Sequence, residues 1–293
     1  MRVLIIKLGA TGDVLRTTTL LRIFNDEIDW ITSGMNVSML NNPDFQVNTY
    51  AWEEARELRN KKYDLVINLE DTAETAEFLR HIEYSDLYGA YLDKKDNLVY
   101  TESSRDWFDL SLISRFGRVK ADELKLLNRK SYQELVFCGL GHQFDQQKYV
   151  MPEAVDTDLK GDVAIAPKAG SVWPMKNWAF YDDLTVQLEK KGFVVNYLPQ
   201  RATLLQHMGD IKNHRYLISG DSLPMHIALG LDLKCITLFI CTSPWEIHDY
   251  GIQKKIISPL LGEFFYKRVN DRRATTSIAV TQVLNTFDEL VIS

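Results

Sequence analysis

A short run of leucine and β-branched side chains, Val3-Leu4-Ile5-Ile6, passes directly into a loop with the sequence Lys7-Leu8-Gly9-Ala10-Thr11-Gly12-Asp13. Such a run predicts a buried parallel strand, and two glycines within four residues allow a tight turn close to a ligand. Residues 14–24 then predict a helix, so Asp13 would lie at a helix N-terminus and at the carboxyl edge of a sheet, where open α/β folds bind ligands. The glycine spacing fits neither the dinucleotide fingerprint nor a P-loop. On spacing alone, a strand-to-helix turn with Asp13 as the helix cap is the favoured interpretation.

Strands alternate with helical patterns along both halves of the chain, which is typical of parallel α/β layers. Residues 85–148 are less regular and rich in aromatic side chains, and residues 152–162 form a polar segment that predicts a linker. The pattern predicts strands at 2–6, 29–32, 64–68, 163–166, 194–198, 215–218 and 235–239, and helices at 15–24, 53–60, 75–81, 180–190, 202–208, 225–229 and 276–290. Two Rossmann-like halves would place a cleft, and with it a substrate site, between them.

Length and composition predict a globular protein that does not span a membrane. The 293 residues suggest two domains of about 150 residues each, and the net charge of −6 argues against a protein that coats nucleic acid. The cysteines Cys138, Cys235 and Cys241 lack metal-ligand spacing and predict buried free thiols in a reducing compartment. With no signal peptide and no apolar run of about 18 residues, we expect a cytoplasmic protein.

A loop at residues 169–178 follows a predicted strand and precedes a predicted helix. Its small residues, the hydroxyl of Ser171 and the ammonium group of Lys176 suit a phosphate held by backbone N–H groups and a point charge. The structural alternative is a solvated Lys176 beside two packing tryptophans. The residues alone leave both interpretations open.

A second loop, at residues 218–226, has a similar position between strand and helix. Ser222 is in the capping position and Pro224 fits the first turn, so the N–H groups there would attract an anion such as a diphosphate. The alternative is a well-capped helix with Asp221 as a structural hydrogen-bond acceptor. If both loops bind phosphate, one diphosphate would lie between them.

Three motifs follow one another along almost the whole chain. They are Lys7-x-Gly9-x-x-Gly12-Asp13-Val14-Leu15 with Arg16-Thr17-Thr18, then Trp173-Pro174-x-Lys176-x-Trp178, then Ser219-Gly220-Asp221-Ser222-x-x-x-His226 closing with Thr242-Ser243-Pro244-Trp245. In order and spacing they resemble the lipopolysaccharide heptosyltransferases, a glycosyltransferase family. The resemblance implies the α/β fold called GT-B, with two facing Rossmann-like domains. It implies an acceptor-binding domain over residues 1–155, a nucleotide-sugar-binding domain over 156–275, and a final helix over 276–293 that packs back on the first domain.

The resemblance also implies an activity. The expected reaction is metal-independent, inverting transfer of a sugar from a nucleotide diphosphate, with no cofactor. ADP-heptose is the expected donor, and the expected acceptor is a lipopolysaccharide core or a related cell-surface glycan or glycolipid. Such an acceptor would bring the protein into peripheral contact with the inner membrane face, and nucleic acid is not an expected partner.

Matching the motifs residue by residue, the resemblance implies that Asp13 is the catalytic base and Lys176 the phosphate-contacting lysine. The chemistry itself needs both groups, because a carboxylate must accept the proton of the attacking hydroxyl and a departing diphosphate needs cations and helix-terminal N–H donors. Lys7 and Arg16 could support the site, reach an acidic acceptor or be an exposed flank. The other implied donor-side residues are Ser171, Gln200, Asp221, Ser222, Leu223, His226 and Thr242, and the implied acceptor-side residues are Lys7, Thr11, Gly12 and Arg16.

Several positions depart from the family pattern and leave the substrate open. Lys168 lies in a region that is glycine-rich in relatives, Val172 stands where an arginine is common, and Ile240-Cys241 replaces Gly-Pro near the expected nucleobase pocket. Gln200 follows a strand where many relatives place a glutamate on the ribose. The sequence Asp156-x-Asp158 forms the metal motif of the other main glycosyltransferase fold, but its place in the predicted linker favours a chance occurrence. The alternatives are another nucleotide-sugar, a protein or modified nucleic-acid acceptor, or a non-catalytic nucleotide-sugar-binding module.

Overall fold

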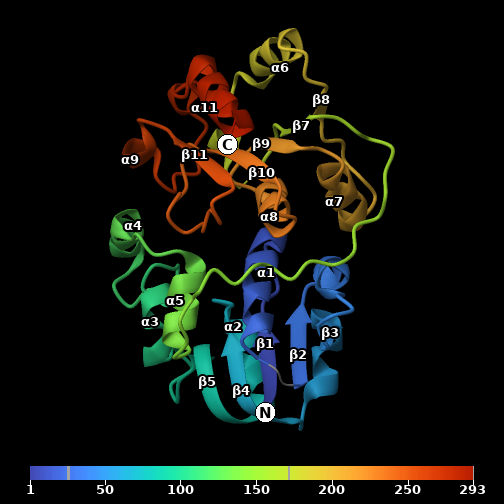
Figure 1. The fold of residues 1–293 in the computed structure, drawn as a ribbon. Coiled ribbons are helices and arrows are strands. Elements are labelled where there is room, and N and C mark those ends of the chain that lie inside the picture. Colours follow the sequence, from blue (N-terminus) through green and yellow to red (C-terminus); the bar gives the residue numbers. More distant parts are fainter. Residues whose placement is uncertain (25–26, 171, 293) are drawn as a thin grey trace. The chain divides into compact units, whose positions relative to one another are not determined.

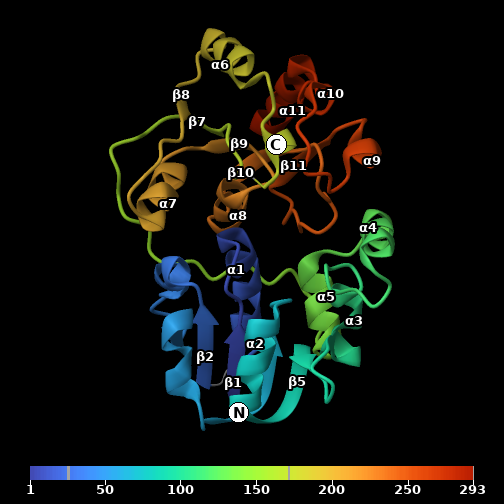
Figure 2. The same ribbon diagram turned by 180° about the vertical axis from the view of Figure 1, so that it is seen from behind.

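The computed structural model describes residues 1–24, 27–170 and 172–292. Its contacts divide the chain into two compact units, Met1–Pro152 and Glu153–Ser293, whereas the sequence suggested a boundary after residue 155. Figure 1 shows a sheet flanked by helices in each unit, and Figure 2 shows the same elements from behind. Among the described residues, no helix combines the length and the apolar character needed to cross a bilayer.

The first unit contains a six-stranded sheet with the strand order β3-β2-β1-β4-β5-β6. All neighbouring strands are parallel except β5 and β6, which are antiparallel. The strands are β1 (Arg2–Ile6), β2 (Glu27–Thr32), β3 (Val47–Ala51), β4 (Lys62–Asn68), β5 (Glu83–Leu92) and β6 (Leu98–Tyr100). The α-helices are α1 (Thr11–Thr17), α2 (Ala73–Phe78), α3 (Arg105–Phe108), α4 (Arg118–Leu127) and α5 (Tyr132–Gly139).

Strand β1 lies at the centre of this sheet because both of its faces are apolar. Val3 and Ile5 pack in one hydrophobic cluster with residues of β2 and α5, and Leu4 and Ile6 pack in another on the opposite face. A continuous apolar run is what a parallel strand covered on both sides requires. The prediction of a buried parallel strand at 2–6 is therefore confirmed.

The helix expected at 15–24 begins earlier and changes its winding. It starts at Thr11, with Ala10 as the N-cap, and after Thr17 it continues as a 3-10 helix, η1 (Thr18–Arg22). The hydroxyl groups of three consecutive threonines donate hydrogen bonds to carbonyl groups three or four residues earlier, at 2.7, 2.6 and 3.0 Å. Such bonds compete with the regular helical pattern and favour a tighter turn.

The second unit contains a five-stranded sheet with the order β11-β10-β9-β7-β8, in which all neighbours are parallel. The strands are β7 (Val163–Ala166), β8 (Val195–Tyr197), β9 (Tyr216–Gly220), β10 (Lys234–Phe239) and β11 (Gln253–Ile257). The α-helices are α6 (Tyr181–Lys190), α7 (Leu204–Lys212), α8 (Leu223–Gly230), α9 (Leu261–Phe264), α10 (Arg272–Thr275) and α11 (Val280–Ile292). With two mainly parallel sheets, the α/β class predicted from the sequence is confirmed.

The final helix, α11, has its main contacts with α6, β10 and β11 of the second unit. Its buried side chains include Phe287, whose ring lies edge-on to Phe193 and Tyr216 at centroid distances of 5.1 and 5.3 Å. These contacts place its apolar face in the core of the second unit. The packing of this helix on the first domain, expected from the family resemblance, stays a prediction.

The three cysteines are free thiols. Cys235 and Cys241 are buried, as predicted, but Cys138 near the end of α5 is exposed. The prediction that all three thiols are buried is therefore wrong at Cys138.

In each sheet the chain first adds strands on one side of its starting strand and then on the other, so the strand order reverses at one position. In the first unit this position lies between β1 and β4, and in the second it lies between β7 and β9. In open α/β sheets the loops at the carboxyl ends of two such strands form the usual ligand site. The loops after β1, β4, β7 and β9 are therefore where functional residues are expected.

Candidate functional site

Lys7 and Glu70 form an ion pair at the carboxyl ends of β1 and β4, in the first unit. The Lys7 Nζ lies 2.8 Å from the Glu70 Oε1, and the backbone N–H of Leu8 donates to the same oxygen at 2.8 Å. Both side chains are almost completely buried. Burial alone would lower the pKa of Lys7, but the carboxylates of Asp13 and Glu70 raise it above its usual value. Lys7 is therefore a buried, protonated cation and not an exposed flank.

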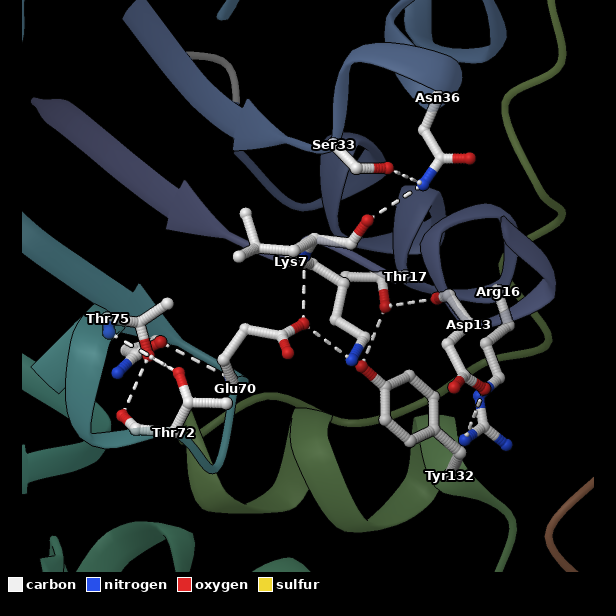
Figure 3. A network of polar contacts seen from close by, with 12 residues as sticks. Lys7, Asp13, Arg16, Thr17, Ser33, Asn36, Glu70, Thr72, Thr75 and Tyr132 are labelled. Atoms are coloured by element: carbon white, nitrogen blue, oxygen red, sulfur yellow. Dashed lines mark hydrogen bonds and ion pairs between the residues drawn. The ribbon is translucent and has the colours of Figure 1, made fainter. Parts of the chain in front are cut away.

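Asp13 lies in the first turn of α1, next to this ion pair (Figure 3). Because Ala10 is the N-cap, the interpretation of Asp13 as the helix cap is wrong. A carboxylate in the first turn is nevertheless favoured by the helix dipole. Its side chain is 35% exposed, and its Oδ1 lies 2.9 Å from a guanidinium nitrogen of Arg16. Asp13 thus remains accessible while an ion pair holds it in place.

The Arg16 side chain is buried against two aromatic rings. Its guanidinium carbon lies 4.1 Å from the ring centre of Tyr132 in α5 and 5.5 Å from that of Trp107 in α3. The Tyr132 hydroxyl is itself 2.7 Å from the hydroxyl of Thr17. A planar guanidinium stacked in this way loses much of its freedom, so α3 and α5 fix Arg16, and Arg16 orients Asp13.

Thr11 and Gly12 are the first two residues of α1, and both are buried. The Thr11 hydroxyl donates to Asn36 Oδ1 at 2.6 Å, and the amide nitrogen of Asn36 donates to the Leu8 carbonyl and to Ser33 Oγ at 2.8 and 2.9 Å. These bonds tie the loop after β1 to the loop after β2, as Figure 3 shows in part. Thr11 acts on the shape of the loop, and the role of Thr11 and Gly12 toward an acceptor stays a prediction.

In the second unit, Lys176 and Asp221 meet at the carboxyl ends of β7 and β9. Lys176 ends a short 3-10 helix, η6 (Pro174–Lys176), and its Nζ donates to the backbone oxygen of Asp221 at 2.6 Å and to the carboxylate Oδ2 at 2.9 Å. The side chains are only 11% and 14% exposed. The interpretation of Lys176 as a solvated lysine is therefore wrong.

Thr242, in the loop after β10, completes this group. Its hydroxyl donates to Asp221 Oδ2 at 2.7 Å, so the same carboxylate oxygen accepts from Lys176 and Thr242. Burial alone would raise the pKa of Asp221, but the Lys176 ammonium, the Thr242 hydroxyl and the electrostatic interaction with His226 lower it to about 2. Asp221 is thus ionised at neutral pH. We call Lys176, Asp221 and Thr242 the lysine–aspartate cluster.

Gly220 permits the close approach on which this cluster depends. A Cβ atom at Gly220 would lie 3.0 Å from the backbone oxygen of Lys176, which is closer than side chains normally pack. The chain then enters α8 with Ser222 as the N-cap residue and Pro224 in the first turn, as predicted. The Ser222 hydroxyl makes no capping bond to the helix and instead donates weakly to the Gly220 carbonyl at 3.4 Å.

The structure brings some predicted donor-side residues together and leaves others apart. Leu223 is the first residue of α8 and His226 is buried in its second turn, beside Asp221. Gln200 is exposed in the loop after the edge strand β8 and makes no described bond to the lysine–aspartate cluster. Ser171 lies outside the described residues. The donor roles of all these residues stay predictions.

The acidic motif at residues 156 and 158 has a different environment. Asp158 pairs with Arg201 at 3.2 Å, and Arg201 also binds the buried Asp210 at 2.7 Å. Within the described ranges, no group of three or more histidine, cysteine or acidic side chains is arranged to hold a metal ion.

Glu70 and Tyr132 were not among the residues predicted from the sequence. Glu70 follows the predicted strand 64–68, and a parallel pairing of this strand with 2–6 would have placed it beside Lys7. Tyr132 had no comparable signal, because α5 lies in the region whose pattern was irregular. Tyr132 contacts Arg16 and Thr17 of α1, and this contact depends on the path that the chain takes after residue 100 to bring α5 beside α1.

Comparisons with known proteins agree with this architecture. Residues 188–265 match the family model of glycosyltransferase family 9 (heptosyltransferase), and no curated protein matches by sequence. The fold is similar to that of E. coli ADP-heptose LPS heptosyltransferase II, with a TM-score of 0.64 at 15% identity, over 100% of this chain and 99% of that one. The E. coli heptosyltransferase WaaC with ADP gives a TM-score of 0.62 at 17% identity, over 99% and 100% of the two chains.

A structure of a family 9 glycosyltransferase from Veillonella parvula DSM 2008 gives a TM-score of 0.63 at 15% identity, over 99% of this chain and 97% of that one. Likeness at this level of identity concerns the fold. The GT-B fold class and the resemblance to heptosyltransferases predicted from the sequence are confirmed.

Proposed function

We propose that this chain is an inverting, metal-independent glycosyltransferase that moves heptose from ADP-heptose to a lipopolysaccharide core or a related surface glycan. The match to the family 9 model and the heptosyltransferase fold support sugar transfer. The solved relatives that carry ADP or ADP-2-deoxy-2-fluoro heptose support a donor of this nucleotide class. The observation that carries the proposal is the pair of charged groups at the sheet edges, one with an accessible carboxylate and one with a buried lysine.

The first unit supplies the group that accepts the proton. A sugar hydroxyl becomes a nucleophile when a carboxylate within hydrogen-bond reach takes its proton as the new bond forms. Asp13 meets the requirements of exposure and orientation, because its side chain is one-third exposed and Arg16 fixes one of its oxygens. Lys7 adds a second positive charge beside it.

The second unit supplies the groups that stabilise the leaving diphosphate. Lys176 uses two of its three ammonium hydrogens on Asp221. A diphosphate at the N-terminus of α8 would interact with the remaining donor and with the helix dipole. Asp221 and Thr242 hold the ammonium group in position, so that little reorganisation is needed when charge develops.

The reaction balances without a further reactant. The acceptor oxygen forms a bond to the anomeric carbon on the face opposite the nucleotide, which inverts that centre. The bond from the anomeric carbon to the phosphate oxygen breaks, and its electron pair stays on the diphosphate. The hydroxyl proton passes to Asp13. Lys176 and the helix-terminal N–H groups meet the charge that a metal ion would otherwise neutralise.

The direct test is a transfer assay with purified protein, ADP-heptose and a heptose-free lipopolysaccharide core. We expect ADP release that depends on the acceptor, together with a product heavier by one heptose. A thermal-shift screen with ADP-, UDP- and GDP-sugars provides a second readout, because a ligand that binds only the folded protein raises the melting temperature. The absence of both transfer and stabilisation by any nucleotide-sugar would refute the proposal.

A further inference from the structure

Residues 112–130 of the first unit form an exposed segment that combines apolar and basic side chains. It comprises the turn before α4, the helix itself and the residues that follow it, and α4 is labelled at the edge of this unit in Figure 1. Leu112, Phe116, Val119 and Leu127 are exposed by 57, 52, 77 and 70%. They are four of the seven large hydrophobic side chains that are exposed among the described residues of this unit. Such clustering of apolar side chains on a surface exposed to water indicates an interaction site.

The same segment is positively charged in a chain that is negative overall. It contains six basic and two acidic residues, a net charge of +4, whereas the whole chain carries −6. The remainder of the chain therefore carries −10. The basic residues are Arg115, Arg118, Lys120, Lys125, Arg129 and Lys130. Along the sequence, the positive charge is thus concentrated in the segment that carries the exposed apolar side chains, and of its basic residues Arg115 pairs with Glu102 and Asp109 outside the segment.

Helix α4 has an inner face, which packs against the first unit, and an outer face, which is exposed. Ala121 is buried, and the Lys125 ammonium lies 6.0 Å from the ring centre of Trp107, which anchors the inner face. Val119 and Leu127 are eight residues apart, just over two helical turns, so both can lie on the outer face. Lys120 pairs with Glu123 at 2.8 Å on the same exposed surface.

We propose that the segment 112–130 docks the protein on an anionic lipid surface. Apolar side chains on a basic helix enter the boundary between headgroups and acyl chains, while lysine and arginine interact with anionic headgroups. A second copy of the chain fits this surface poorly, because a symmetric contact would oppose two segments that each carry +4. The proposal rests on exposure and charge and does not depend on which sugar or acceptor the protein uses.

The test measures binding of the full chain to vesicles of phosphatidylcholine alone and of equimolar phosphatidylcholine and phosphatidylglycerol, by sedimentation. The charge variant is Lys120→Gln/Lys130→Gln, and its control is Lys94→Gln/Lys95→Gln in an exposed turn of the same unit. The apolar variant is Val119→Ser/Leu127→Ser, with Val186→Ser/Val194→Ser as its control on exposed residues of the second unit. Circular dichroism melts confirm that each variant is folded.

We expect wild-type protein to bind the anionic vesicles more tightly than the neutral ones, and added salt to weaken that binding. Each lysine removed from the segment should weaken binding about fivefold, and the apolar variant should weaken it about tenfold. Both controls should bind as wild type does. Equal binding to the two vesicle types, or an equal loss in the controls, would overturn the proposal. Self-association that the apolar variant abolishes, without vesicle binding by the wild type, would assign the surface to a second copy and also overturn it.

Discussion

Asp221→Asn should destabilise the second unit even though the substitution preserves the shape of the side chain. The amide oxygen of the new side chain could still accept from Thr242, but the buried ammonium of Lys176 would lose its negative partner. The ordinary pKa of 3.8 and the value of about 2 in the fold correspond to a difference of roughly 2–3 kcal/mol in favour of the ionised carboxylate. Because the Asp221 side chain is only 14% exposed, solvent screens this interaction weakly.

The same linkage sets a pH range for the contribution. Asp221 has a lower pKa in the folded chain than in the unfolded one, so its contribution is complete above the unfolded value of 3.8. It is lost as the pH falls through about 2. The wild-type protein should therefore lose stability across this acidic range, and the loss should be smaller in Asp221→Asn.

Urea unfolding of the whole chain at neutral pH measures the effect. It is followed by tryptophan fluorescence, to which each unit contributes three tryptophans. A double-mutant cycle with Lys176→Met separates the ion pair from other changes. We expect Asp221→Asn to cost roughly 2–3 kcal/mol in the wild-type background and much less in Lys176→Met. The matched control is Asp158→Asn, whose carboxylate is 94% exposed beside Arg201 and should contribute less than about 1 kcal/mol. An equal loss in both backgrounds would show that Lys176 and Asp221 are not coupled, and the reasoning would fail.

The remaining predictions concern the reaction. Lys176→Ala should lower kcat more than it raises the KM for the donor, because the leaving diphosphate gains charge only as its bond breaks; a loss of up to about 3–4 kcal/mol of transition-state stabilisation is expected, and a change in KM alone would contradict this. Arg16→Gln should lower kcat by roughly 10–100-fold while ADP affinity stays unchanged, since Arg16 positions Asp13; calorimetry with ADP provides the control. Activity should survive EDTA, and recovery by Mg²⁺ or Mn²⁺ after a chelator-induced loss would show that a metal is needed.

The sequence predicted the elements whose side chains follow a simple pattern. The strands 163–166 and 235–239 and the helix 180–190 coincide with β7, β10 and α6 to within a residue. Strand β11 was missed because its sequence, Gln253–Ile257, contains two lysines, and only part of it is buried. Strand β5 was missed because its first four residues are exposed and polar or aromatic. Patterning detects strands covered on both faces better than strands near an edge.

The candidate site was predicted only in part, because motifs reveal residues but not their partners. Lys176 and Asp221 were both selected, yet their ion pair depends on β7 and β9 being neighbours, although β8 intervenes in the chain. The N-cap at Ala10 was missed because an alanine side chain has no group that can cap a helix. Helix α1 begins at Thr11 without a side-chain capping bond. The stacking of Arg16 on Tyr132 joins residues 116 positions apart, and no local pattern carries that information.

Asp13→Asn tests the proposed chemistry most directly. The variant keeps the shape of the side chain and removes its ability to accept a proton, so transfer from ADP-heptose should fall by about 10²–10⁴-fold. Calorimetry with ADP should give the wild-type affinity, because the expected donor residues lie in the second unit. Asp183→Asn, an exposed acid in α6, is the matched control and should retain full activity. Near-wild-type turnover in Asp13→Asn, with the control unchanged, would contradict the assignment of the base.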